Sequence, residues 1–378
     1  MKNNLTFRIL GIIARTLLGL TFIFSGFVKA VDPLGTVYKI EDYLNAFGGV
    51  FSSLVPAAPV FACCLIMFEL VLGVLLTFNV WMKVSSWLAL AMMLVMTPLT
   101  LYIAIANPVT DCGCFGDAIH LSNWATFGKD IVLLALAIVL LLTRDHLFDT
   151  WIRPMSIGIC CAAVLLTAGI MAYSLLHLPF IDFRPYKVGN YLPDLMEVEI
   201  PEDAPADEYE YTFIYEKDGV QKEFTLDNYP KNDTSWVFVD QTSKLIKKGY
   251  EVPEPPVHDF VLTYTDEEGN IEDLTEDILE ADSVMLVVMH KVEKADKRQA
   301  AKINRLWEAA QESGLMFYAL TGSGEREVDI WRQETGAEYP FCTCDGVTLK
   351  TIVRANPGVV VLHAGTVVYK YNLRNKKL

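Results

Sequence analysis

The segment from Pro59 to Phe78 reads PVFACCLIMFELVLGVLLTF and contains one charged side chain, that of Glu69. A helix rises about 1.5 Å per residue, so about 20 apolar residues cross the ~30 Å hydrocarbon core of a bilayer. The chain contains further stretches of similar length and composition at Arg8–Lys29, Val84–Ala106, Thr126–Thr143 and Met155–Leu178. The sequence therefore predicts five membrane-spanning helices.

The overall composition indicates a membrane protein that also carries a polar domain. Of the 378 residues, 52% are hydrophobic and 20% are charged, and the mean hydropathy is +0.31. These values are too apolar for a purely soluble protein of this length. The net charge of −15 excludes a general attraction to nucleic acid, so no nucleic-acid partner is expected. Most acidic residues follow residue 185, which indicates a separate polar region.

The basic residues of the short loops predict the orientation of the helices. Lysine and arginine are retained on the cytoplasmic side of a membrane. Such residues precede the first span and follow the second and fourth spans, at Lys2, Arg8, Lys83, Arg144 and Arg153. The first span resembles a signal peptide but lacks a small-x-small cleavage site, so we expect it to be retained. We therefore predict a multi-pass protein in the lipids of a bacterial inner membrane, with a cytoplasmic amino terminus and a periplasmic carboxy-terminal domain.

The outer loop from Pro33 to Pro56 has apolar residues at helical spacing, including Val37, Ile40 and Leu44. This spacing suits a helix that lies in the membrane interface. The segment is interpreted either as a lid or as a simple amphipathic connector.

The most specific local motif is Asp111-Cys112-Gly113-Cys114-Phe115-Gly116-Asp117, in the outer loop between the third and fourth spans. Two thiols one residue apart at an oxidising surface can form a small, strained disulfide of the kind that exchanges readily. The two glycines of the motif would supply the backbone angles that such a turn requires. A soft metal such as Cu(I) bound by both thiolates, or a purely structural turn, are the alternatives.

The remaining cysteines of the spans form two adjacent pairs. Cys63 and Cys64 would lie about one turn below the outer surface, where they are candidate relay partners for the motif or simple packing residues. Cys160 and Cys161 would lie near the cytoplasmic face and are interpreted as packing residues.

Charged residues within the spans are costly and usually face a cavity or the interior of the helix bundle. Glu69, Lys29, Lys129 and Asp130, together with Ser25 and the cysteines, are therefore predicted to form a polar pocket that opens outward. Glu69 could carry a proton beside a redox centre or could pair with Arg15. Lys129 and Asp130 are adjacent, point about 100° apart on a helix and need not pair with each other.

The sequence resembles the DoxX-type membrane proteins, in particular the MauE-like branch associated with methylamine utilisation. The resemblance covers about residues 8–143 and rests on Arg15-Thr-Leu-Leu-Gly19, Ser25-Gly-Phe-Val-Lys29, Glu69-Leu-Val-Leu-Gly73 and the cysteine motif. It implies a four-helix module linked to thiol-disulfide or quinone-coupled redox work, with Cys112 and Cys114 as the redox pair and a quinone as the cofactor. Disulfide-generating four-helix enzymes carry Cys-x-x-Cys, and this spacing occurs nowhere in the chain.

The outer region divides at a proline-rich break around Pro253. Before it, short alternating segments split by Lys217-Asp-Gly219 predict antiparallel strands. After it, strands alternate with helices and end in a hairpin, as in an α/β domain with a central sheet. The expected strands are Phe260–Tyr264, Val284–Met289, Met316–Leu320, Val359–Leu362 and Val367–Tyr371, and the expected helices are Lys297–Glu312, Glu325–Glu334 and a short one near Val347–Arg354. This part resembles a thioredoxin-like or peroxiredoxin-like domain, and Asn356-Pro357 stands where that fold carries its cis-proline.

The expected reactive position of the thioredoxin-like domain carries no cysteine. In that fold, the cysteine follows the central strand at the start of a helix, where the helix dipole lowers its pKa. The corresponding segment begins Met289-His290-Lys291 and contains no thiol. His290 could border an emptied cleft or lie on the surface. Cys342 and Cys344 could form a second disulfide, but buried thiols are the preferred interpretation.

The predicted fold is a membrane α-helical bundle, a four-helix core plus a fifth helix, followed by a periplasmic α/β thioredoxin-like domain. The predicted divisions are the four-helix module at 1–150, the fifth helix and linker at 151–184, a β-rich segment at 185–251 and the thioredoxin-like domain at 252–378. The predicted function is thiol-disulfide exchange with an envelope client or thiol donor. The alternatives are a non-catalytic membrane-anchored binding or assembly protein, and a subunit of a quinone-linked oxidoreductase.

Overall fold

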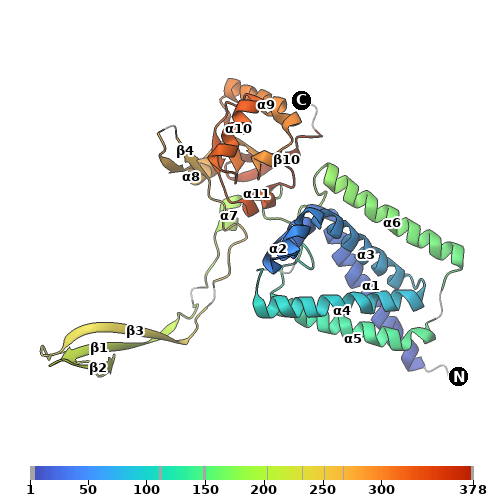
Figure 1. Cartoon of the computed structure of the whole chain (residues 1–378), viewed down its shortest axis with the longest axis horizontal. Helices are drawn as coiled ribbons and strands as arrows, with labels where there is room; N and C mark the ends of the chain where they lie inside the picture. Colours follow the sequence, from blue (N-terminus) through green and yellow to red (C-terminus); the bar gives the residue numbers. More distant parts are fainter. Residues whose placement is uncertain are drawn as a thin grey trace. The chain divides into compact units, whose positions relative to one another are not determined.

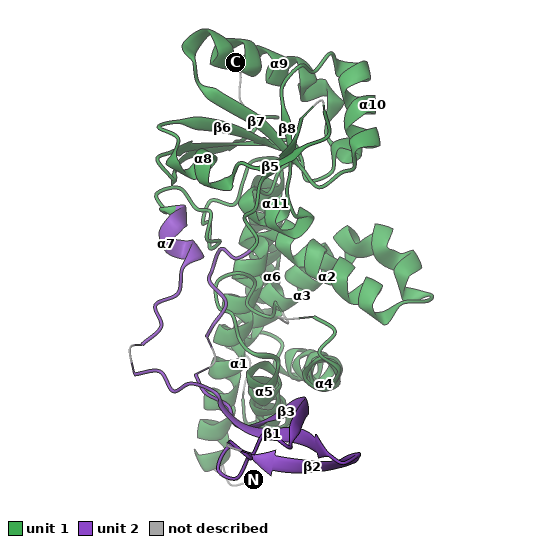
Figure 2. Ribbon diagram, turned by 90° about the vertical axis from the view of Figure 1, so that its left-hand side faces the viewer, with its two compact units in different colours: residues 1–191, 259–378 green, residues 192–258 purple. Residues whose placement is uncertain are grey.

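The structure is a computed structural model that describes residues 5–109, 113–147, 150–201, 203–231, 233–250, 252–266 and 268–375. The chain forms two compact units (Figure 2). One contains residues 1–191 and 259–378, and the other contains residues 192–258.

Five helices in the described part of the chain are long and apolar enough to cross a membrane, as the sequence predicts. They are α1 (Leu5–Val31), α3 (Ala58–Thr77), α4 (Met82–Ala106), α5 (Asn123–Thr143) and α6 (Arg153–Leu176). Helix α1 packs on α3 and α5, α4 packs on α5, and α6 lies along α3 (Figure 1). Large apolar side chains such as Leu142 and Leu165 point outward, as expected for helices surrounded by lipid.

Small residues bring α1 and α3 into close contact. A Cβ atom on Gly26 would lie 2.7 Å from the backbone nitrogen of Leu70, and one on Gly73 would lie 2.6 Å from that of Ile23. Helix association in membranes uses such small residues because they let the backbones approach. This close approach places the polar residues of the two helices within direct reach of each other.

The outer loop after α1 is helical, which confirms the spacing prediction for Pro33 to Pro56. It forms α2 (Pro33–Phe47), followed by the 3-10 helix η1 (Phe51–Ala57). The carboxylate of Asp32 caps α2 by accepting a hydrogen bond from the backbone of Gly35 at 3.0 Å. Val37 and Leu44 are buried against the start of α3, so α2 is fixed to the outer end of the bundle.

Residues 192–258 contain a short helix, α7 (Leu192–Met196), and a three-stranded antiparallel sheet in the order β2-β1-β3. The strands are β1 (Glu208–Lys217), β2 (Val220–Thr225) and β3 (Val237–Lys247). The hairpin between β1 and β2 turns at Asp218 and Gly219, which both have positive φ angles of 54° and 77°. A two-residue turn of this kind matches the twist of antiparallel strands, and it confirms the break that the sequence predicts there.

Residues 259–378 form an α/β domain around a seven-stranded sheet in the order β10-β9-β6-β7-β8-β4-β5. The central strands β6, β7 and β8 are parallel, and the flanking pairs are antiparallel. The elements are β4 (Thr263–Thr265), β5 (Ile271–Asp273), α8 (Thr275–Glu280), β6 (Val284–Val288), α9 (Ala300–Ser313), β7 (Met316–Thr321), α10 (Glu325–Thr335), β8 (Phe341–Thr343), α11 (Gly346–Ile352), β9 (Gly358–His363) and β10 (Thr366–Asn372). Three short 3-10 helices lie at Arg144–His146 (η2), Val292–Lys294 (η3) and Lys297–Gln299 (η4).

The observed sheet confirms the predicted α/β architecture with one shifted strand. The strand expected at Phe260–Tyr264 begins only at Thr263. The backbone of Leu262 bonds instead to the start of α8, through the hydroxyl of Thr275 and the amide of Leu274. The bond between Asn356 and Pro357 is cis, at the position that the thioredoxin-like resemblance implies.

Candidate functional site

A small polar cavity of about 20 Å³ lies among α1, α3, α4 and α5, next to the loop that carries the cysteine motif. Its lining includes six residues of the predicted polar pocket, Ser25, Lys29, Glu69, Cys114, Lys129 and Asp130, but not Cys63 or Cys64. The structure therefore brings together residues from four segments that are far apart in the sequence.

A buried ion pair forms the inner wall of this cavity. Lys29 Nζ lies 2.6 Å from Glu69 Oε2, and the two residues are 5% and 4% exposed. Lys29 also donates to Ser25 Oγ at 2.9 Å, and Ser25 in turn donates to the backbone carbonyl of Cys114 at 2.7 Å. Ser25 and Lys29 share a helix face because they are four residues apart. A continuous chain of hydrogen bonds thus joins the motif to Glu69.

The alternative pairing of Glu69 with Arg15 is wrong. Arg15 Nη1 donates to the backbone carbonyls of Leu76 and Thr77 at 3.0 and 2.9 Å, near the end of α3. Arg15 lies about four helical turns before Lys29 on α1, so it reaches the carboxy-terminal end of α3, about two turns beyond Glu69.

A second ion pair, between Lys129 and Asp130, forms the opposite wall of the cavity. The spacing of these adjacent residues on a helix does not predict the pair. Lys129 Nζ lies 3.0 Å from Asp130 Oδ1, because the long lysine side chain bends back along the helix. Asp130 is 2% exposed and also accepts a hydrogen bond from Thr100 at 3.1 Å. Lys129 lies 4.7 Å from the ring centre of Phe115 in the motif, so its charge faces the cysteine loop.

The described part of the motif is a tight turn. Gly113 and Gly116 have φ angles of +66° and +53°, as predicted, and Gly116 donates a backbone hydrogen bond to Gly113 at 3.0 Å. Cys114 is buried and packs against Ile103 of α4. Cys112 lies outside the described residues, so the pairing of Cys112 with Cys114 remains a prediction.

The other cysteines of the spans lie apart from the cavity. Cys63 and Cys64 are on α3 but do not line it, and Cys64 is exposed on the helix surface. Their relay role remains a prediction. Cys160 is partly buried and Cys161 exposed on α6, away from the motif.

Cys342 and Cys344 are buried thiols without a disulfide, so the second-disulfide alternative is wrong for this structure. Burial raises the pKa of both thiols to about 12. Thiols with so little thiolate are poor nucleophiles. Within the described residues, no group of three or more His, Cys, Asp or Glu side chains is placed to hold a metal ion.

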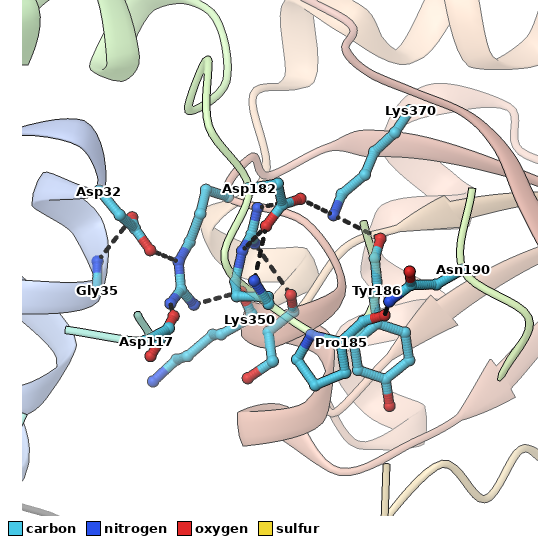
Figure 3. Close-up of polar contacts among 12 residues, drawn as sticks. Asp32, Gly35, Asp117, Asp182, Pro185, Tyr186, Asn190, Lys350 and Lys370 are labelled. Atoms are coloured by element: carbon cyan, nitrogen blue, oxygen red, sulfur yellow. Dashed lines mark hydrogen bonds and ion pairs between the residues drawn. The ribbon is translucent and has the colours of Figure 1, made fainter. Parts of the chain in front are cut away.

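The α/β domain contacts the membrane module through Arg354, which follows α11. Figure 3 shows the two carboxylates on the membrane module, those of Asp32 and Asp117. Arg354 Nε lies 2.8 Å from Asp32 Oδ2, and Nη2 lies 2.9 Å from Asp117 Oδ2. Its guanidinium also lies over the ring of Tyr38, at 5.4 Å from the ring centre. Burial opposes the charge of Arg354, but the two carboxylates outweigh it and raise the pKa. Because Asp117 closes the cysteine motif, the domain touches the motif loop directly.

A second network fixes the linker that follows α6 (Figure 3). Arg184 binds Asp182 with two hydrogen bonds of 2.7 and 2.9 Å and donates to the carbonyl of Thr351 at 2.9 Å. Lys370 of β10 lies 2.7 Å from the same Asp182. Burial, followed by the Arg184 charge, lowers the pKa of Lys370 to about 7, against the opposing effect of Asp182. The linker is therefore bound to both α11 and β10.

The cis-proline face of the α/β domain borders the same contact region. Asn356 donates to the carbonyl of Lys291 at 2.9 Å, and the amide of Asp296 donates to the carbonyl of Asn356 at 3.3 Å. A polar cavity of about 140 Å³ lies beside this loop, with Leu34 of α2 on its far wall. The segment that would carry a thioredoxin cysteine is thus tied to the cis-proline loop.

His290 is partly buried. Its ring packs edge-on against Tyr38 of α2, with centres 6.2 Å apart. Burial, followed by the nearby charges of Lys350 and Lys291, lowers the pKa of His290 to about 4. The imidazole is therefore neutral at neutral pH.

Sequence reasoning missed the contact between the domain and the module. In the sequence, Asp117 is the last residue of the cysteine motif, Asp32 is one acidic residue of a loop, and Arg354 ends a predicted short helix. An isolated arginine carries no periodic signal, and its partners are more than 200 residues away in the sequence.

The fold and the site together define a multi-pass membrane protein, in which a helical module carries an ionic cavity and is followed by an α/β domain with a mixed seven-stranded sheet. Residues 7–143 match the family of the methylamine utilisation protein MauE. Residues 209–248 match a domain of unknown function, DUF8463. A search of curated proteins found no match.

One solved structure similar to part of the chain is the solution structure of a Bacteroides thetaiotaomicron protein proposed to be a protein disulfide isomerase. The two are 19% identical with a TM-score of 0.26, and the similarity covers 31% of this chain and 77% of the other.

Proposed function

We propose that this chain is a thiol-disulfide exchange factor of the bacterial inner membrane, in which Cys112 and Cys114 form the reactive pair. The observation that supports this most is the position of Cys114. It lines a cavity that contains the buried Lys29–Glu69 ion pair and the partly exposed Lys129–Asp130 ion pair, and its carbonyl accepts the hydrogen bond of Ser25 that begins the chain to Lys29 and Glu69. Ionisable groups buried in a membrane are usually functional, and these surround a thiol.

The exchange step is a transfer of one disulfide to a client dithiol. A client thiolate attacks one sulfur of the Cys112–Cys114 disulfide, the bond between those sulfurs breaks, and a mixed disulfide forms while the other cysteine leaves as a thiolate. The second client thiolate then attacks the mixed disulfide. The client gains a disulfide, and the two protons and two electrons of its thiols end on Cys112 and Cys114.

The cavity side chains would compensate charge during this exchange. Each leaving cysteine is negatively charged until it gains a proton, and a nearby cation stabilises a thiolate. Lys129 faces the motif ring of Phe115, and Lys29 is joined to the Cys114 backbone through Ser25. Glu69 would hold the proton that Lys29 exchanges. These roles make Lys29, Glu69, Lys129 and Asp130 candidates for a proton path.

Return of the pair to the disulfide requires a two-electron acceptor. A membrane quinone is the class that the resemblance to the MauE family implies: it would take two electrons and two protons from the dithiol and become a quinol. The acidic outer loops and basic inner loops favour a periplasmic motif and a periplasmic α/β domain, where envelope clients are found.

A second candidate function is that of a membrane-anchored binding or assembly protein. It is favoured by the segment from Met289 to Gln299, which contains no cysteine although it occupies the reactive position of the fold. In this interpretation, the α/β domain binds a partner and the motif is structural.

The test is the thiol state of the full-length protein in cells. Cells are quenched with acid, and their proteins are unfolded in detergent so that burial does not protect a thiol. The proteins are then alkylated before and after reduction, and each cysteine is mapped by mass spectrometry. We expect Cys112 and Cys114 to react only after reduction, and Cys112→Ser to remove the protection of Cys114. Cys160→Ser, on α6, serves as the matched control and should change nothing. Alkylation of Cys112 and Cys114 without reduction would contradict the proposal and favour the binding protein.

A further inference from the structure

Arg354 is the most heavily bonded side chain of the contact between the α/β domain and the membrane module. Its side chain is 6% exposed, and each of its three nitrogens has a partner. Nε and Nη2 reach the carboxylates of Asp32 and Asp117, and Nη1 donates to the carbonyl of Lys350 at 2.6 Å. Only a planar, forked donor can serve three acceptors in this way, so lysine is not an equivalent residue here.

The two carboxylates that Arg354 binds, those of Asp32 and Asp117, have different structural roles. Asp32 caps α2 and belongs to the frame of the module. Asp117 ends the cysteine motif, one residue after the turn that Gly113 and Gly116 form. The motif loop is therefore held at two points, by Ser25 on the carbonyl of Cys114 and by Arg354 on Asp117. The first belongs to the membrane module and the second comes from the α/β domain.

We propose that Arg354 is a positioning residue for the cysteine motif, through which docking of the α/β domain controls access to Cys114. This inference rests on the proposed function of Cys112 and Cys114. With Arg354 bound to Asp117, the loop keeps Cys114 buried against Ile103. When the contact is lost, the loop loses its link to the α/β domain and opens more often. The coupling is reciprocal, so a change in the motif also changes how firmly the domain docks.

The α/β domain thereby has a use that needs no cysteine of its own. The elements near its cis-proline face, including His290 and Arg354, contact Tyr38 of α2 and the motif loop. A domain in this position acts on the motif by contact instead of by thiol chemistry.

The test measures the alkylation rate of Cys114 in the reduced full-length protein in detergent. Arg354→Gln and Asp117→Asn should each raise this rate at least about fivefold, the lower end of usual coupling strengths. Asp32→Asn keeps the α2 cap, because asparagine is also a good capping residue, and should have a smaller effect. Arg332→Gln, an exposed arginine of α10, is the matched control and should leave the rate unchanged.

Internal controls separate loop opening from unfolding. Cys64 is exposed and should react equally in all variants, whereas Cys342 and Cys344 report unfolding of the α/β domain because they are buried. If Arg354→Gln exposes these two thiols, Arg354→Lys and Asp117→Asn replace it. Combining Arg354→Gln with Asp117→Asn should add nothing to either change alone, because both remove the same contact.

Unchanged Cys114 rates in both variants, or fully additive effects, would overturn the inference. Opposite effects of the two variants would also overturn it, since they would show a through-space charge effect instead of positioning. The proposed function has its own readout in the wild-type protein. If Cys112 and Cys114 form a reducible pair but Arg354 does not control access to Cys114, only the inference fails.

Discussion

The bundle cavity and the cis-proline face of the α/β domain differ in the cysteines and ionisable groups that they contain. The cavity has a cysteine, two ion pairs and a chain of hydrogen bonds, in a helical module without a Cys-x-x-Cys. The cis-proline face has the sheet, the loop and the cis bond at Pro357, but its thiols are buried elsewhere, in and beside β8. The α/β domain thus has the sheet and the cis-proline loop, whereas the ionisable groups of the cavity lie in the neighbouring helical module.

The largest expected effect comes from breaking the buried pair of Lys29 and Glu69. Lys29→Met should lower the free energy of unfolding by about 3 to 5 kcal/mol, because it leaves a buried carboxylate without its partner. Denaturation of the purified membrane protein measures this, with the exposed Lys83→Met as the control. Adding Glu69→Leu should restore much of the stability but not thiol exchange. If the double variant carries out thiol exchange at the normal rate, the ion pair has only a structural role, and the contrast drawn between the two regions is wrong.

Acid should destabilise the packing of His290 against Tyr38 by a smaller free energy. We expect about 1 to 2 kcal/mol, after an allowance for the partial exposure of the imidazole. Its folded pKa of about 4 lies below the ordinary value of 6.5, so the folded protein binds this proton less tightly than the unfolded chain. The stabilisation is complete above pH 6.5 and is lost as the pH falls towards 4. Hydrogen exchange of α2 against pH measures it.

His290→Phe should remove this part of the pH dependence, whereas the exposed His363→Phe should retain it. An identical pH profile in wild type and His290→Phe would show that other groups govern the contact.

A weaker effect is expected for Ser25→Ala, which removes the bond to the Cys114 carbonyl and one partner of Lys29. The loss should be about 1 kcal/mol of stability, typical of one hydrogen bond. The alkylation rate of Cys114 should rise in the same variant, while Ser53→Ala on the exposed η1 segment changes neither quantity. A normal rate in Ser25→Ala would remove Ser25 from the set of groups that hold the motif.

The smallest effect on thiol exchange is expected from replacing the two thiols of the α/β domain. With a pKa of about 12, Cys342 and Cys344 have about 1,000-fold less thiolate at pH 8 than thiols of pKa 9. Replacing either by Ala should leave exchange with a client unchanged, as measured by client oxidation in cells. A loss of exchange without a loss of folding would show that the comparison between the two regions is wrong.

The sequence predicted the fold better than it predicted the contacts. Apolar length predicted the five spans, alternation with helices predicted the central sheet, and the cost of buried charge predicted which side chains share the cavity. The short strands β5 and β8 were missed because three residues give no periodic pattern. The links of Arg354 to Asp32 and Asp117 depend on tertiary geometry, which the spacing of residues in the sequence does not contain.

The end of β10 returns to the helix from which the α/β domain departs. Asn372 donates to the backbone carbonyl of His177 at 3.1 Å, and Asn375 donates to that of Leu176. With the bonds of Lys370 and Arg184 to Asp182, these contacts leave the linker little slack. A pulling force on the α/β domain would therefore be transmitted directly to α6. Tension applied by a partner bound to the domain would then reach the membrane.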